Sequence, residues 1–152
     1  DSLRVKSEIV KLPLPKITEA EIAAAKETVR VVKDLKTKFQ DKVKAFQVLD
    51  VAAREGKPWE VEVQVIALGD RVAWVSLPGE IFVELGLAIK KTSPFAFTHI
   101  AELANGSIGY VPDKPAYGQG NYEVISARCA EGSGELLVAS ATRLLQEMKN
   151  GK

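Results

Sequence analysis

The carboxylate of Glu80 is the side chain whose position is most suggestive of chemistry, because it follows a Pro78-Gly79 turn. An apolar segment at 71–75 precedes the turn and predicts a buried strand, and another at 81–89 predicts a mostly buried helix. A side chain between two rigid elements is held firmly and can point into a cleft. Alternatively, Glu80 occupies the first turn of the following helix, where the helix dipole favours negative charge.

Three tyrosines are the second group of candidates. Tyr110, Tyr117 and Tyr122 all fall between residues 105 and 123, and two of them flank a glycine-rich stretch. Each brings an apolar ring with one polar hydroxyl, so tyrosines gathered around a loop can line a pocket. Structural packing of the rings is the alternative interpretation.

His99 and Cys129 occur once each in the sequence. A Ser-His-Asp triad within this chain could use no base other than His99, but its place in an apolar strand favours a hydrogen-bonded core histidine. A single cysteine excludes an intrachain disulfide and a multi-cysteine zinc site, and we expect Cys129 to be buried and inert. No His-Glu-x-x-His run occurs, so no complete metal site can be read from this chain alone.

The composition indicates an ordinary globular chain. It has 152 residues, 46% hydrophobic and 27% charged, with a net charge of +1, which suits a single domain without a strong field for nucleic acid. Lysines gather between residues 26 and 44, but acidic residues alternate with them, as on a solvated helix face. A role of this segment at a polyanion or membrane surface is an alternative. No apolar run is long enough for a transmembrane segment.

The first half of the chain predicts an arm and a hairpin. Residues 3–14 alternate loosely and predict an edge strand or extended arm. Thr18 and Glu21 form a capping-box pattern, and the helical stripe that follows runs to Glu55 as one helix or as two broken near 36–41. We expect this arm to pack across a sheet. Two strands joined at Gly69-Asp70 predict a hairpin.

The second half predicts a helix from about Glu80 to residues 90–91 and then several short elements. These are a strand at 95–103, an extended piece at 108–112, a loop at 114–121, a strand at 122–128 and a helix at 136–148. The predicted fold class is α/β or α+β. It has a mixed sheet of about five to six strands, a long N-terminal helical arm and a C-terminal helix packed on the sheet.

Two segments resemble the neutral/alkaline non-lysosomal ceramidases. The first is the run 63–69 followed by Leu77-Pro78-Gly79-Glu80. The second begins at Asn105-Gly106-Ser107-Ile108-Gly109-Tyr110-Val111 and continues to Tyr117 and Tyr122-Glu123 with similar spacing. The resemblance covers about 59–123. It implies a zinc amidase that cleaves the N-acyl bond of ceramide, with zinc held by two histidines, a glutamate and a tyrosine.

Under this resemblance Glu80 and Tyr110 correspond to metal ligands, and Tyr122 corresponds to the tyrosine that holds the scissile carbonyl. Zinc accepts such oxygen ligands and activates a bound water, and a phenol hydroxyl near it can stabilise an oxyanion. The resemblance also implies a secreted, periplasmic or membrane-surface location. Zinc is expected only in the complete protein.

The sequence departs from the family in two respects. The family's zinc histidines lie in an earlier half that has no counterpart here, and residues 81–83 differ from the usual pattern after the turn. We therefore expect residues 1–152 to form one domain, the C-terminal portion of a larger catalytic domain. Because the chain begins at Asp1, it is expected to be a processed product or an excised piece. The expected partners are the N-terminal portion and an N-acyl lipid substrate. The alternative is a non-catalytic module used for packing or partner binding.

Overall fold

A four-stranded mixed sheet forms the body of the protein, whose computed structural model describes residues 2–151. The order across the sheet is β1 (Leu3–Leu12), β2 (Trp59–Leu68), β3 (Val72–Ser76), β5 (Phe97–Ala101). β1 and β3 both run antiparallel to β2, and β5 runs parallel to β3. This confirms the edge strand, the hairpin at Gly69-Asp70 and the mixed α+β class. The strands of the described residues are divided between this sheet and a smaller one.

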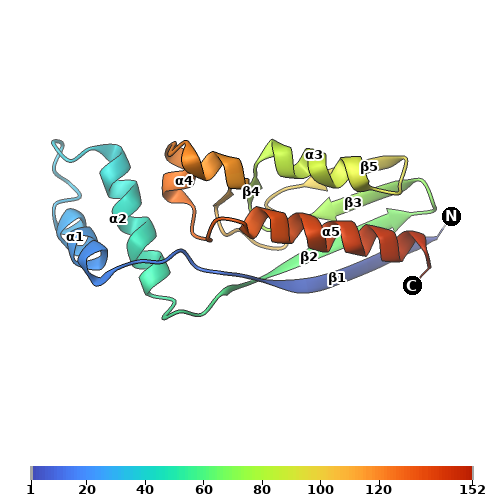
Figure 1. Cartoon of the computed structure of the whole chain (residues 1–152), viewed down its shortest axis with the longest axis horizontal. Helices are drawn as coiled ribbons and strands as arrows, with labels where there is room; N and C mark the ends of the chain where they lie inside the picture. The colour runs from blue at the N-terminus through green and yellow to red at the C-terminus, as the bar shows by residue number, and fades with distance from the viewer. Residues whose placement is uncertain (1, 152) are drawn as a thin grey trace.

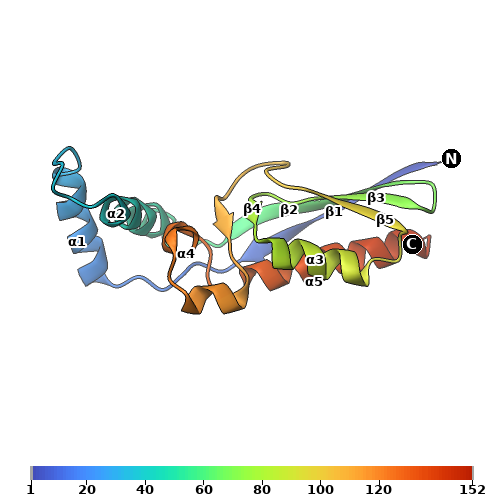
Figure 2. The ribbon, with the colours of Figure 1, turned by 90° about the horizontal axis from the view of Figure 1, so that it is seen from above.

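The two faces of the four-stranded sheet differ sharply. α3 (Val83–Thr92) and α5 (Ser133–Lys149) lie against one face, as Figure 2 shows. Alternate residues of β2, such as Val63 and Val65, point into that layer and are fully buried. The opposite face has no helix on it among the described residues, and large apolar side chains remain exposed there. α5 begins a few residues earlier than expected, because Ser133 and Gly134 are already helical.

The smaller sheet pairs β4 (Glu80–Ile81) with β6 (Tyr110–Val111) in parallel. The interpretation of Glu80 as a residue of the first helical turn is therefore wrong. Its backbone N–H donates to the Gly109 carbonyl at 3.0 Å, which ties Glu80 into the sheet, and α3 begins only at Val83. Glu80 thus belongs to a short strand between β3 and α3.

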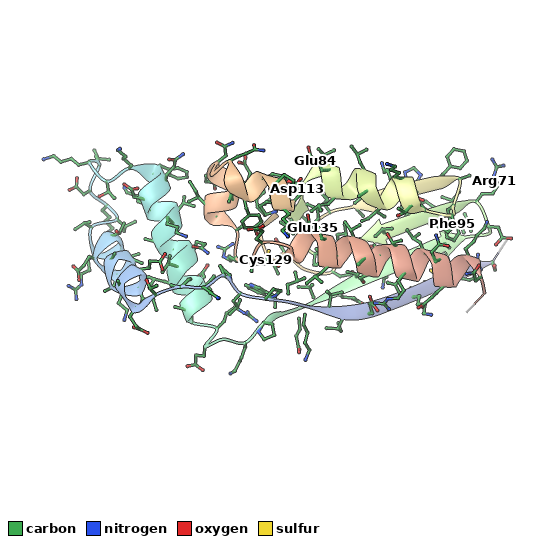
Figure 3. The ribbon with its side chains drawn as sticks, in the orientation of Figure 1. Arg71, Glu84, Phe95, Asp113, Cys129 and Glu135 are labelled. Carbon is green, nitrogen blue, oxygen red and sulfur yellow. The ribbon has the colours of Figure 1, made fainter. Side chains whose placement is uncertain are left out.

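The N-terminal arm folds into two helices, α1 (Glu19–Arg30) and α2 (Phe39–Ala52), which lie beyond one end of the sheet (Figure 1). The capping box of Thr18 and Glu21 is confirmed. The break between the helices starts earlier than expected, at Val31. The expectation that the arm packs across the sheet is wrong, because the two helices bury their apolar stripes against each other. Arg71 and Phe95, labelled in Figure 3, mark the opposite end of the molecule.

The segment before α5 contains two short helical elements, η1 (Lys114–Gly118) and α4 (Tyr122–Ser126). The strand predicted at 122–128 is wrong. The pattern Tyr122, Val124, Ser126 suggested alternation, but the segment forms a short helix that packs against α2 and beside β6 without pairing with that strand. η1 adds a 3₁₀ turn to the predicted loop. The strand expected at 95–103 is shortened to β5.

Candidate functional site

Glu80 and Tyr110 are brought together by the register of the small parallel sheet, in which they are direct partners. Gly79 makes the approach possible. A Cβ atom at this position would lie 2.7 Å from the Gly109 carbonyl oxygen and 3.2 Å from the Val111 side chain. The Pro-Gly-Glu turn therefore requires glycine because the two segments pass close together. The result is a carboxylate and a phenol side by side at a strand end.

The phenol of Tyr110 interacts directly with this carboxylate. The hydrogen bond that its hydroxyl donates to Glu80, followed by the negative charge of Glu80, raises the pKa of Tyr110 above its ordinary value. Smaller contributions come from desolvation and from Tyr122 and Glu123. The Tyr110 hydroxyl therefore keeps its proton at neutral pH and directs it toward Glu80.

Tyr122 completes the group from the beginning of α4. Its ring meets that of Tyr110 edge-on, with the centroids 6.0 Å apart and an interplanar angle of 78°. On its other side Tyr122 stacks on Phe39 of α2, with centroids 6.0 Å apart at 18°. Offset and edge-on pairs of this kind fix ring orientation. The three residues singled out from the sequence, Glu80, Tyr110 and Tyr122, therefore lie together.

An open cavity of ≈ 300 Å³ adjoins this group. Glu80, Tyr110, Tyr122 and Arg128 supply its polar wall, and Phe46 of α2, together with Val43, supplies an apolar wall. The helical arm, which we expected to pack across a sheet, thus contributes to the site. Phe39 and Phe46 are spaced seven apart on one helix face, a signal that could have indicated this. Arg128 gave no comparable signal.

The other candidates from the sequence lie outside the cavity. His99 is exposed on β5 and stacks on its register partner Trp74 at 5.8 Å, so the expectation of a core histidine is wrong. It faces the uncovered side of the sheet, where strand alternation points every second side chain. Tyr117 donates a hydrogen bond to the Cys129 carbonyl at 3.0 Å, and burial raises its pKa.

Cys129 is almost fully buried, as expected, in the segment between α4 and α5 (Figure 3). Burial raises the pKa of its thiol, which keeps it in the unreactive protonated form at neutral pH.

The donor set fits part of a zinc site. Carboxylate and phenol oxygens are acceptable ligands, but zinc normally has a fuller tetrahedral set that includes nitrogen or sulfur. Within residues 2–151 no group of three or more His, Cys, Asp or Glu side chains could hold a metal ion. Glu80 and Tyr110 could therefore hold zinc only together with ligands from outside this chain.

Among residues 2–151, no helix combines the length and apolar character needed to cross a membrane.

Comparison with known proteins finds a similar fold among solved structures. No family model and no curated protein matches this chain. Among solved structures, it is similar to the neutral ceramidase from Pseudomonas aeruginosa, with a TM-score of 0.59 and 17% identity over 97% of this chain and 29% of that chain. A structure described as a ceramidase complexed with C2 gives a TM-score of 0.56 and 13% identity over 97% and 31%.

The chain thus spans less than a third of the length of either structure. At these identities the likeness concerns the backbone, and it extends well beyond the residues 59–123 in which the sequence resemblance was seen. The chain has the fold of one part of a neutral ceramidase.

Proposed function

We propose that this chain is the later part of a ceramidase-like zinc amidohydrolase that cleaves the N-acyl amide of ceramide or a related N-acyl lipid. Glu80 and Tyr110 serve as metal ligands, Tyr122 stabilises the oxyanion, and two histidines come from an N-terminal portion of the same catalytic domain. The observation that supports this best is the direct pairing of Glu80 with Tyr110, with Tyr122 against Tyr110, in a chain with part of the ceramidase fold.

The residues of this chain have distinct tasks in the proposed reaction. Zinc, when bound, supplies a water of lowered pKa and polarises the amide carbonyl. Glu80 and Tyr110 would hold the ion with their oxygens, and the Tyr122 hydroxyl would donate a hydrogen bond to the carbonyl oxygen as negative charge develops there. Phe46 and Val43 would provide an apolar surface for the acyl chain.

The test uses the protein with its upstream region included. We expect that preparation to retain about one zinc ion per chain, measured by inductively coupled plasma mass spectrometry, and the 152-residue chain to retain little. Glu80→Gln should lose the zinc together with hydrolysis of a short-chain ceramide. Tyr122→Phe should keep the zinc and lower kcat by roughly 10²–10³.

Glu84→Gln is the matched control, because Glu84 is an exposed carboxylate just beyond the same turn. It should keep both zinc and activity. A longer protein without zinc, or Glu80→Gln with unchanged activity, would contradict the proposal and favour the non-catalytic module.

A further inference from the structure

Arg128 is a cation in the candidate cavity to which the proposed amide chemistry gives no task. It lines the same cavity as Glu80, Tyr110 and Tyr122. Its side chain is 35% exposed, so it is neither a freely solvated surface arginine nor a buried structural one. Such a group in a cavity requires an explanation.

The backbone around Arg128 is fixed at three successive residues. Buried Gln47 donates to the Ala127 carbonyl at 2.9 Å. The Trp59 indole donates to the Arg128 carbonyl at 3.1 Å, and the Tyr117 hydroxyl donates to the Cys129 carbonyl at 3.0 Å. Three side chains from three different elements therefore hold this segment. The backbone position from which the Arg128 side chain extends is thus fixed.

The guanidinium is fixed on one side only. Nε donates to Asp50 of α2 at 2.9 Å. Nη1 lies against Gly109, whose φ is +79° and at which a Cβ atom would come within 2.9 Å of Nη1. Among the hydrogen bonds of residues 2–151, Asp50 is the only partner of the guanidinium. The Nη nitrogens thus keep N–H donors next to a residue that lines the cavity.

We propose that Arg128 determines specificity and that the preferred substrate of this cavity carries a carboxylate, as an N-acylated amino acid does. That the substrate has an N-acyl group rests on the proposed function, and that it has a carboxylate is inferred from Arg128. A guanidinium presents parallel N–H donors that match both oxygens of a carboxylate. The apolar wall of Val43 and Phe46 accepts the acyl chain, while Arg128 binds the anionic end. A neutral N-acyl lipid has no carboxylate to accept from the Nη N–H donors that Asp50 leaves unused.

The test measures binding to the 152-residue chain itself by isothermal titration calorimetry and by NMR chemical-shift changes. Three ligands share one acyl chain: N-lauroylglycine, the neutral N-lauroylglycinamide, and laurate. N-lauroylglycine should bind at least roughly tenfold more tightly than the amide, as expected for a charge-assisted pair. Arg128→Gln should abolish this preference, and Arg128→Lys should keep part of it.

Two controls separate ligand binding from a structural role. Asp50→Asn removes the negative charge that pairs with Arg128 but keeps the guanidinium, so it should retain the preference. Loss of the preference would mean that Arg128 merely ties α2 to the body. Arg143→Gln alters an arginine paired with Glu8 on the β1 side of α5 and should change nothing. If Arg128→Gln lowers the melting temperature, the ligand preferences of Arg128→Lys and Asp50→Asn still distinguish ligand binding from a structural role.

Other outcomes overturn the inference. Equal binding of the glycine and glycinamide ligands contradicts it, as does a preference that survives in Arg128→Gln. If laurate binds as tightly as N-lauroylglycine, Arg128 recognises a fatty-acid carboxylate and the substrate class is wrong. Because no zinc is needed, a longer protein without zinc would refute the proposed function while the carboxylate preference of this chain stood.

Discussion

At the scale of single residues, the site depends on the interaction between the Tyr110 hydroxyl and the Glu80 carboxylate. The hydrogen bond to Glu80, and then its charge, raise the pKa of Tyr110 above 10.0. In Glu80→Gln we therefore expect that pKa to fall toward its ordinary value, which NMR of ¹³C-labelled tyrosine rings would measure. Glu84→Gln should leave it unchanged. An unaltered titration in Glu80→Gln would show that the two side chains are not coupled.

The raised pKa of Tyr110 also determines how its contribution to the stability of the fold changes with pH. Because the pKa of Tyr110 is raised in the folded state, its interaction with Glu80 contributes fully below the pKa of the unfolded chain. The contribution is lost as pH rises from the unfolded-state pKa through the raised one. We expect the difference in unfolding free energy between the wild type and Tyr110→Phe to be constant near neutral pH and to shrink in strong alkali.

At the scale of elements, the close passage of β4 and β6 makes Gly79 sensitive to substitution. In Gly79→Ala the new Cβ would meet backbone 2.7 Å away, so the strands must separate, at a cost of about 1–3 kcal/mol of unfolding free energy. Urea denaturation would measure the loss. Gly118→Ala is the matched control, because nothing lies within 4 Å of its Cβ position. Equal stability of the two variants would contradict this account.

The elements also show what the sequence could predict. The hairpin, the capping box and the fold class followed from local patterns, since each is set by neighbouring residues. The pairing of Glu80 with Tyr110 could be inferred only through the family resemblance, because residues thirty apart have no local signal. The helix at Tyr122 and the position of the arm depend on contact between α2 and α4, which no periodicity within either segment reveals.

At the scale of the whole molecule, the sheet is covered on one face only. Trp74, Phe97, Val5 and Ile9 lie on the other face and remain 37%, 52%, 57% and 61% exposed. A monomeric protein seldom exposes so many large apolar side chains on one surface. Helices cover the opposite face (Figure 2). The proposed function requires an upstream portion that packs against this chain, and we expect an apolar layer of that portion to cover this face.

This packing can be tested by one substitution in two backgrounds. In the 152-residue chain, Trp74→Lys should change the melting temperature little, because the side chain is partly exposed. In the longer protein the same lysine would be buried without a partner, so we expect a loss of roughly 2–5 kcal/mol of unfolding free energy and of bound zinc. Leu87→Lys, at an exposed position of α3, should have a mild effect in both proteins. An equally mild effect of Trp74→Lys in the longer protein would mean that the upstream portion packs elsewhere. The roles of Glu80 and Tyr110 as zinc ligands would still be tested separately by the zinc content.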